Sequence, residues 1–382
     1  MIIFQPGSHA YRLVYVLLLV GEFPFRSLGL LGDERTMKAV AVRLTQSHEF
    51  VLKDTDVCFC GRIITISGKG NLKTIRLTRY AFSFIEQVMP ELFRQYLNSY
   101  DQHHFRGSKY AIDRHHRVAE AISFCLRSGI ESNILLLPQL QKADNILIQY
   151  HEPAFYHGKY LKNLGFEEIN KTKFTRMVGA LFYGTGCYVV YNTRNAKMKW
   201  NGRGESKTSL HISDICMKNT SFKDVRSAIL FGKDYDIALE TLRASELDPK
   251  EENRFDYVYR HMHFVPQEDI GEKILRLITT PNWNRTLLEM IFESDELSDQ
   301  NASFTYDACV NGKYILSFMD SDIIKLLRFK RGIRSLHVKW EILCFPEQLQ
   351  FLRAYLGKEA TLKCFDADGI VGELCSERRC LI

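Results

Sequence analysis

The first hundred residues hold the feature that most limits what this chain can fold into, an apolar segment that begins a series of short elements. The run Leu13–Val20 is apolar throughout, but a membrane-spanning helix needs about 20 such residues. With only Arg12 before the run and no small-residue cleavage site after it, it is also a poor signal peptide. We therefore expect a helix over His9–Val20, buried on most of its surface and ended by Gly21.

Two further helices are expected next. Phe25–Leu31 is a short apolar segment long enough for two turns of helix. Asp33 is a good N-cap for the following helix, in which apolar side chains recur at spacings of three and four: Met37, Val40, Ala41 and Leu44. Such spacing predicts an amphipathic helix with one face in a core.

A hairpin and another helix complete the N-terminal pattern. The β-branched runs Arg62–Ile66 and Leu72–Leu77 are joined by Ser67–Asn71, which is rich in residues that tolerate positive φ. Thr78 is expected to cap the next helix, with a kink or break at Pro90. Three helices, a hairpin and a helix predict a winged helix-turn-helix domain over residues 1–100. In that fold, the third helix enters the major groove of DNA and the hairpin, or wing, follows the backbone.

The exposed side of the third helix and the wing are both basic. The candidate DNA-binding side chains are Arg35, Thr36, Lys38 and Arg43 on the helix and Lys69, Lys73 and Arg76 on the wing. Lysine and arginine neutralise phosphates and reach base edges, so this pattern predicts double-stranded DNA as the partner. Winged helices also serve as protein-interaction modules, and that alternative stays open.

Charge along the chain agrees with a nucleic-acid partner. The formal net charge of the 382 residues is +6. Residues 171–220 carry nine basic and two acidic side chains, whereas residues 221–300 carry 10 basic and 17 acidic ones. Such asymmetry is typical of a protein that presents one face to nucleic acid, although a solvated surface explains any single block equally well.

The ten cysteines are spaced irregularly from Cys58 to Cys380 and include no CxxC pair. This usage predicts reduced thiols in a cytoplasmic protein and no structural zinc. No Gly-Lys pair has the glycine and the Ser or Thr that a P-loop requires, so nucleotide hydrolysis is disfavoured.

Residues 101–382 are predicted to form a mixed α/β domain, with a further boundary near 245–255, so that the fold class is α+β or mixed. The expected elements are a helix from Asp113, a hairpin turning at Gly184–Gly186, a strand over Val225–Phe231, a helix over Asp236–Leu242 and a hairpin turning at Asn311–Gly312. Strands that alternate with helices indicate such a domain.

Glu205-Ser206-Lys207 matches half of a nuclease site, in which a carboxylate holds Mg²⁺ and the lysine steadies the attacking water. That chemistry needs a second acid on the preceding strand, and no Asp or Glu lies between Lys171 and Arg203. Glu120 is the one acid that could be recruited from the helix before. A surface ion pair is the alternative interpretation of Glu205 and Lys207.

His261-Met262-His263 is the second candidate for chemistry, because alternate residues of a strand lie on one face. Two such imidazoles could hold the cation of a tyrosine-dependent nickase, with Tyr257 or Tyr259 as the nucleophile. His-x-His is expected by chance roughly 0.4 times in a chain of this length with 12 histidines, and the tyrosines alternate as an ordinary strand would.

Asp320 and Asp322 precede an expected helix over Ile323–Phe329. Two aspartates beside a strand end could bind a cation. Helix capping is the more common role of such residues and the one we expect.

Three segments together resemble the replication-relaxation family of plasmids and conjugative elements. They are Gly29–Thr36, Lys73–Thr78 and Arg114–Glu120, and the resemblance covers residues 8–130 best. It implies a winged-helix protein that helps to replicate or mobilise an element, followed by a degenerate α/β domain similar to restriction endonucleases. It also implies that Arg35, Lys38 and Arg43 read DNA and that Lys69 and Lys73 belong to the wing.

The sequence therefore predicts a cytoplasmic, sequence-specific DNA-binding accessory protein of a mobile element, with no membrane partner and no cofactor. It would recruit a relaxase or a replication protein without chemistry of its own. A metal-dependent nuclease or nickase, which would use Mg²⁺, is the first alternative. A winged-helix transcriptional regulator is the second.

Overall fold

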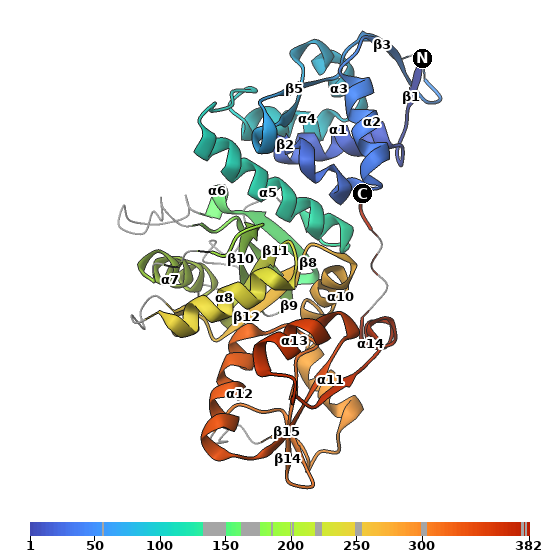
Figure 1. Ribbon diagram of the computed structural model, residues 1–382. Coiled ribbons are helices and arrows are strands. Elements are labelled where there is room, and N and C mark those ends of the chain that lie inside the picture. The colour runs from blue at the N-terminus through green and yellow to red at the C-terminus, as the bar shows by residue number, and fades with distance from the viewer. Residues whose placement is uncertain are drawn as a thin grey trace. The chain divides into compact units, whose positions relative to one another are not determined.

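A computed structural model of the protein is shown in Figure 1. The structure describes residues 1–55, 57–132, 150–161, 176–184, 186–198, 200, 202–217, 224–248, 254–298, 304–375, 378 and 380–382. The chain forms two compact units. Unit 1 comprises Met1–Leu136 and Cys380–Ile382, and unit 2 comprises Leu137–Arg379.

Unit 1 is built from helices and short strands. Its helices are α1 (His9–Val20), the 3-10 helix η1 (Phe25–Leu31), α2 (Glu34–Leu44), α3 (Phe82–Val88), α4 (Pro90–Ser99) and α5 (Lys109–Arg127), with two single 3-10 turns at Gly70–Leu72 and Arg79–Ala81. Its strands are β1 (Ile2–Phe4), β2 (Phe23–Pro24), β3 (His48–Leu52), β4 (Cys58–Gly61), β5 (Ile64–Ser67), β6 (Thr74–Leu77) and β7 (Glu131–Ser132).

Helix α1 forms the centre of unit 1, as its apolar sequence predicts. Its buried side chains are Ala10, Leu13, Val14, Val16, Leu17, Leu18, Leu19 and Val20. Ser8 caps its first turn by accepting the backbone N–H of Tyr11. Helices α2, α4 and α5 all pack against α1, so they share one core.

The expected second and third helices are confirmed. The second is the 3-10 helix η1, with the predicted bounds. Asp33 caps α2, and Met37, Ala41 and Leu44 are buried along one side of it. Val40, which we expected in the same stripe, is only half-buried.

The expected hairpin is also confirmed, and a third strand joins it. Strands β5 and β6 pair antiparallel, with Ile66 opposite Ile75. Strand β2, between α1 and η1, pairs antiparallel with the other side of β6, so the strand order is β2-β6-β5.

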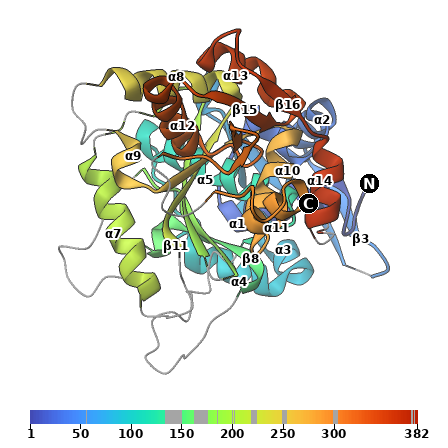
Figure 2. The same cartoon turned by 90° about the horizontal axis from the view of Figure 1, so that it is seen from below.

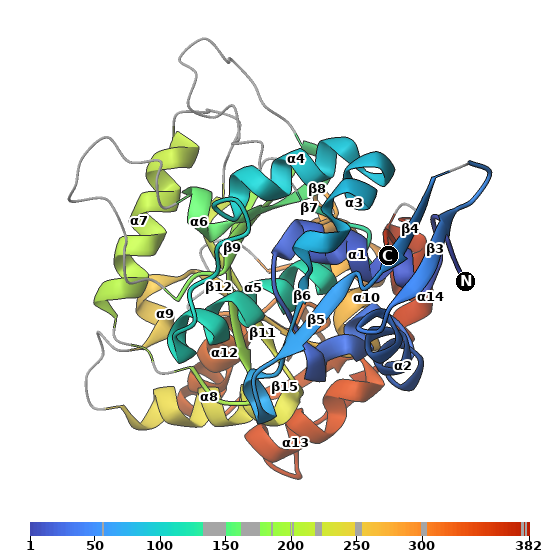
Figure 3. The same ribbon diagram turned by 90° about the horizontal axis from the view of Figure 1, so that it is seen from above.

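A second sheet of unit 1 was not predicted, because residues 45–61 read as a loop. In this sheet β3 pairs antiparallel with β4 and parallel with β1, in the order β1-β3-β4. Figure 3 shows the β3–β4 hairpin extending beside β5 and β6. Its core side is aromatic, since Phe50 and Phe59 stack with ring centroids 6.1 Å apart.

The helix after the hairpin breaks where Pro90 predicts. Met89 separates α3 from α4, and Pro90 is the first residue of α4. The predicted cap at Thr78 is wrong, because its hydroxyl donates to the backbone oxygen of Arg62 and makes no capping bond. This hydrogen bond joins the end of β6 to the residues just before β5.

Unit 2 contains two sheets. The strands of the first are β8 (Tyr150–His157), β9 (Gly179–Gly184), β10 (Gly186–Arg194), β11 (Asp224–Gly232) and β12 (His261–Pro266), and those of the second are β13 (Ala308–Val310), β14 (Lys313–Ser317), β15 (Lys339–Cys344) and β16 (Leu362–Cys364). The helices are α6 (Gly158–Leu161), α7 (Arg203–Met217), α8 (Tyr235–Leu247), α9 (Phe255–Val258), α10 (Asp269–Ile278), α11 (Trp283–Ile291), α12 (Ile323–Leu336), α13 (Leu349–Leu356) and α14 (Ala367–Leu374), with a 3-10 turn at Pro346–Gln348.

The first sheet of unit 2 is mixed. Strands β10, β11 and β12 run parallel, and β9 is antiparallel to both β8 and β10. Helix α7 connects β10 to β11 and α8 connects β11 to β12, the arrangement that parallel neighbours require. Strand β10 is buried along its whole length, which explains why it reads as a continuous apolar run rather than an alternating one.

The second sheet has the order β13-β14-β15-β16. The predicted turn at Asn311–Gly312 is confirmed, since both residues have positive φ and β13 pairs antiparallel with β14. Strands β14, β15 and β16 are parallel, with α12 and α13 as connections. Helix α8 contacts both α12 and α13 (Figure 2), so the two sheets of unit 2 share these helices.

All ten cysteines are free of disulfides. None of the helices in the described ranges combines the length and the apolar character that crossing a bilayer demands.

The end of α1 generates a test of this packing. Gly21 has φ +74°, and a Cβ placed on it would lie 2.7 Å from Cε1 of Tyr100. We expect Gly21→Ala to lower the free energy of unfolding by about 1–3 kcal/mol, because the backbone is strained and the ring is displaced. Urea unfolding measures this. Gly107→Ala is the matched control, since a Cβ at Gly107 meets nothing within 4 Å; equal losses in both variants would contradict the packing.

Candidate functional site

The outward side of α2 is a slim, basic surface. Arg35, Ala39 and Arg43 are exposed on it, and Val42 is 48% exposed beside them. Because Ala39 has a short side chain, the helix can approach a partner closely between the two arginines. The spacing of four residues puts Arg35, Ala39 and Arg43 on one face of the helix.

The loop between β5 and β6 carries the second group of basic residues. Lys69 is exposed between Gly68 and Gly70, which both have positive φ and form the turn. Lys73 is half-exposed, and its ammonium lies 4.0 Å from the centroid of the Phe25 ring. This cation–π contact holds the Lys73 ammonium beside the Phe25 ring.

A groove of about 500 Å³ lies between the end of α2 and strand β5. Its lining residues are Val42, Thr45, Arg62, Ile64, Thr65, Ile66 and Lys73. Arg62 was not a predicted site residue; it is exposed, with its guanidinium 5.6 Å from the centroid of the Tyr80 ring. The groove joins the exposed face of α2 to the hairpin in one concave surface, which we call the α2–hairpin surface.

Arg76 does not belong to this surface, which corrects its predicted role. Its guanidinium forms an ion pair with Glu22, whose side chain is fully buried at the end of α1. His115 on α5 donates from Nδ1 to the other oxygen of the same carboxylate at 2.6 Å. Arg76 also lies over the Phe105 ring. The charge of Arg76 is therefore used inside unit 1.

Two other predicted residues have local partners. Thr36 donates both its backbone N–H, at 2.8 Å, and its hydroxyl, at 2.6 Å, to Oδ1 of Asp33. These hydrogen bonds lower the pKa of Asp33. Lys38 forms a surface ion pair with Glu34, one turn earlier. Lys38 remains half-exposed, whereas Thr36 serves the start of α2.

Glu205 and Lys207 are not brought together. Both lie in the first turns of α7, where residues two positions apart are separated by about 200° around the helix axis. Accordingly, Glu205 is buried and Lys207 is exposed. Glu120, the acid that we considered recruiting, belongs to unit 1 and accepts a hydrogen bond from the Ser27 hydroxyl at 2.6 Å. The nuclease-type interpretation of Glu205 and Lys207 is wrong, because the two side chains lie on different sides of α7.

The strand predicted at His261-Met262-His263 is confirmed as β12. The two imidazoles lie on one side of it, with ring centroids 6.4 Å apart and planes within 14° of parallel. Nδ1 of His261 donates to Oδ2 of Asp322, and Nδ1 of His263 donates to the backbone oxygen of Asp320. Tyr257 is exposed on α9 rather than on a strand, and Tyr259 is buried with its hydroxyl bonded to that of Tyr191. Both histidines line a pocket of unit 2, which we call the histidine pocket, and the tyrosines in its lining are Tyr183, Tyr188 and Tyr306.

Asp322 caps α12, as predicted, and also joins α12 to β12. Its Oδ1 accepts the backbone N–H groups of Ile324, Lys325 and Met262. Its Oδ2 accepts Nδ1–H of His261 at 2.7 Å. Burial alone would raise the pKa of Asp322, but these hydrogen bonds and the neighbouring histidines outweigh it and hold the pKa well below its ordinary value.

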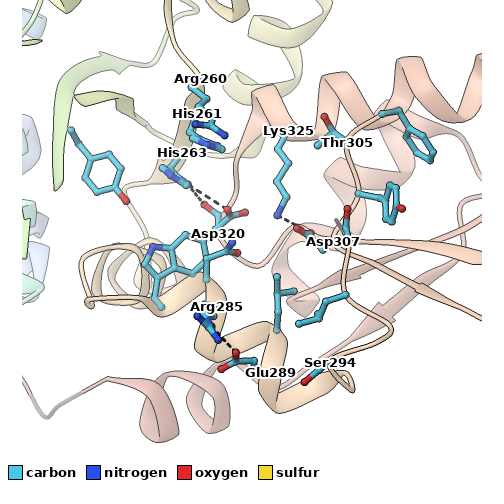
Figure 4. A pocket seen from close by; sticks show the side chains of 18 of the residues that line it. Arg260, His261, His263, Arg285, Glu289, Ser294, Thr305, Asp307, Asp320 and Lys325 are labelled. Carbon is cyan, nitrogen blue, oxygen red and sulfur yellow. Dashed lines mark hydrogen bonds and ion pairs between the residues drawn. The ribbon is translucent and has the colours of Figure 1, made fainter. Parts of the chain in front are cut away.

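Asp307 and Lys325 form a buried ion pair that lines the histidine pocket (Figure 4). Lys325 reaches the carboxylate of Asp307 at 2.7 Å and the backbone oxygen of Ser317 at 3.2 Å. Burial lowers the pKa of Lys325, but the carboxylates of Asp307 and Asp320 raise it overall. Asp307 and Lys325 were not predicted as site residues, and they are brought together by the β13–β14 pairing, which no local motif records.

Within the described parts of the chain, no three His, Cys, Asp or Glu side chains come together in a way that could hold a metal ion. Comparison of the chain with protein-family models, curated proteins and solved structures finds no match. Both possible sites therefore stand on their own geometry.

The ion pair of Arg76 predicts a stability effect rather than a binding effect. Arg76→Ala leaves the buried carboxylate of Glu22 without its guanidinium, and breaking a buried pair costs about 3–5 kcal/mol. We expect a loss of that order in urea unfolding. Arg79→Ala removes the same charge from an exposed position and should change stability by less than about 1 kcal/mol. Equal unfolding midpoints for the two variants would contradict the assignment of Arg76.

Asp322 predicts a stability effect that depends on pH. Its pKa is lower in the folded protein than the ordinary value of 3.8, so its contribution is complete above about pH 4 and declines as pH falls further. Asp322→Asn should therefore cost about 3–5 kcal/mol at pH 7, and the gap to the wild type should narrow between pH 4 and pH 2. Denaturant unfolding across this range measures it. The exposed Asp368→Asn is the control, and a gap that stays constant with pH would contradict the role of Asp322.

Proposed function

We propose that unit 1 is a winged helix-turn-helix that binds double-stranded DNA sequence-specifically through the α2–hairpin surface. The observation that carries the proposal is the concave surface itself. Arg62, just before β5, and Lys73 line the groove, whose α2 side is formed by Val42 and Thr45. Arg35 and Arg43 on α2 and Lys69 on the hairpin turn add exposed cations on the two elements that border it.

The order of elements supports this proposal. Helix α1, strand β2, helices η1 and α2 and the β5–β6 hairpin follow one another, and the strands pair as β2-β6-β5. A winged helix uses this order to place its recognition helix in the major groove and its wing on the backbone. The β3–β4 hairpin is then an insertion between α2 and the wing.

The residues divide by the kind of contact they would make. Arg35 and Arg43 lie on the face of α2 that would enter the major groove of DNA, and arginine reads guanine through two hydrogen bonds. Lys69 and Lys73 lie on the wing, where an ammonium neutralises phosphate without regard to sequence. Lys38 contributes after it releases Glu34, and such surface pairs are weak.

For the whole chain we propose an accessory protein of a plasmid or conjugative element that binds DNA and recruits a relaxase or a replication protein. The resemblance of residues 8–130 to the replication-relaxation family supports this role. Glu205 and Lys207 point to different sides of α7, which gives no support to a nuclease. Tyr257 lies on α9 rather than beside the histidines on β12, and Tyr259 is buried with its hydroxyl bonded to that of Tyr191, which gives no support to a nickase. A transcriptional regulator would use the same surface with other partners.

The test begins with selection of duplexes from a random library by the wild-type protein at ~150 mM salt, where phosphate contacts alone bind weakly. Fluorescence anisotropy then compares variants on the selected duplex. Arg35→Ala/Arg43→Ala should weaken binding by about 100-fold or more, since each base contact is worth about 1–3 kcal/mol. Lys69→Ala should weaken binding to every duplex similarly and reduce the salt slope by about 1.

The matched control is Arg334→Ala/Lys358→Ala, which removes two exposed cations from unit 2. This variant should bind the selected duplex with wild-type affinity. Equal losses in the control and in Arg35→Ala/Arg43→Ala, or failure to select any sequence, would overturn the proposal.

A further inference from the structure

We propose that the pocket of unit 2 beside His263 and Asp320 is a binding site for a single nucleotide, with the base held between aromatic rings and the phosphate at the rim. The pocket has a volume of about 1020 Å³, and ligand pockets usually measure about 300–1,000 Å³. This inference goes beyond the DNA interface of unit 1 and does not depend on it.

One wall of the pocket is a continuous series of rings. Tyr183 stacks on Tyr188 with centroids 4.7 Å apart, His263 meets Tyr188 edge-on at 5.4 Å, and Trp283 meets His263 edge-on at 6.1 Å. Tyr183 and Trp283 are only half-buried, so part of each ring is left for a ligand. A nucleobase stacked on an aromatic side chain gains about 1–3 kcal/mol.

Two further rings belong to the lining. Phe304 and Tyr306 lie with centroids 5.1 Å apart, and both are half-buried. They come from the segment before β13, whereas Trp283 begins α11. Aromatic side chains from separate elements therefore face the same cavity.

Asp320 supplies the polar group that would recognise a base. Its Oδ1 accepts the backbone N–H of Asp322 at 3.1 Å. Its Oδ2 lies 3.8 Å from Nδ1 of His263, too far for a hydrogen bond, because that N–H is donated to the backbone oxygen of Asp320 at 2.9 Å. This nearly buried carboxylate thus keeps acceptor capacity at the pocket. Figure 4 shows it beside His263. Ring N–H and amino groups of nucleobases are donors that fit it.

The charges around the pocket favour one nucleotide over a long polyanion. Lys325 is buried and neutralised by Asp307, whereas Arg285 is exposed and forms a surface ion pair with Glu289 at 2.6 Å. Arg260 is exposed and lines the pocket, where it can meet a phosphate. Asp320 then provides an acidic acceptor within the pocket, which suits an uncharged base.

The backbone beside Asp320 is held in an unusual conformation. Ser321 is fully buried with φ +53°, a conformation that costs energy in a residue other than glycine. Its hydroxyl bonds to the Tyr235 hydroxyl at 2.7 Å and receives the amide N–H of Gln348 at 2.8 Å. These bonds hold the side chain of Ser321, the residue directly after Asp320, in place.

Tryptophan fluorescence tests the proposal on the full-length chain. The protein has three tryptophans, Trp200, Trp283 and Trp340, of which only Trp283 lines the pocket. Titration with each of the four deoxynucleoside monophosphates, and with short single-stranded oligonucleotides, should give saturable quenching for at least one of them. Trp283→Phe should abolish the quenching, and the matched control Trp340→Phe should retain it.

Two variants test the recognition itself. Asp320→Asn should weaken nucleotide binding about tenfold or more. Arg260→Ala should lower the affinity for a monophosphate but leave the affinity for the corresponding nucleoside unchanged. Quenching by monophosphates identifies a free nucleotide as the ligand, and quenching by oligonucleotides alone identifies an unpaired nucleotide of DNA. Absence of quenching by all probes at 1 mM, on the order of the weakest useful affinities, would overturn the proposal. Quenching that persists unchanged in Asp320→Asn, Arg260→Ala and Trp283→Phe would also overturn it.

Discussion

Unit 1 depends on one buried carboxylate. Glu22 is fully buried directly after α1, and its two oxygens are shared by Arg76 on β6 and His115 on α5. A buried charge is tolerated only when it is paired, so the end of the central helix, the hairpin and the long helix α5 must meet at this point. The position of the hairpin relative to α2, and with it the α2–hairpin surface, follows from this constraint.

The same constraint separates structural from functional cations. Arg76 on the hairpin serves the interior, whereas Lys69 and Lys73 on the same hairpin remain at the surface. Unit 2 also contains a buried carboxylate with a structural role. Asp322 accepts hydrogen bonds from His261 and from three backbone N–H groups. Its neighbour Asp320 has fewer partners and lines a pocket. In both units, the charged side chain whose partners are all within the fold stabilises the structure. The charged side chains with fewer partners lie where a ligand can reach them.

Much of this could be predicted from the sequence where the signal is local. The apolar run of α1, the cap at Asp33, the stripe of α2 and the Asn311–Gly312 turn all act within a few residues, and each is confirmed except for Val40 in the stripe. What the sequence missed is long-range. Strand β1 pairs with β3 some fifty residues later, Arg76 finds Glu22, and Lys325 finds Asp307. The motif Glu205-Ser206-Lys207 predicted a site that the structure does not form. A spacing of two residues places side chains on one face of a strand but on different sides of a helix, and these residues lie on helix α7.

The most direct test of the central claim, that the α2–hairpin surface contacts DNA, is hydrogen–deuterium exchange of the full chain with and without a selected duplex. The account predicts slower exchange on binding in peptides that cover α2 and residues 67–73. Exchange in the peptides of α3 and of β14–β15 should not change. Protection confined to unit 2, with α2 and the hairpin unaffected, would contradict it.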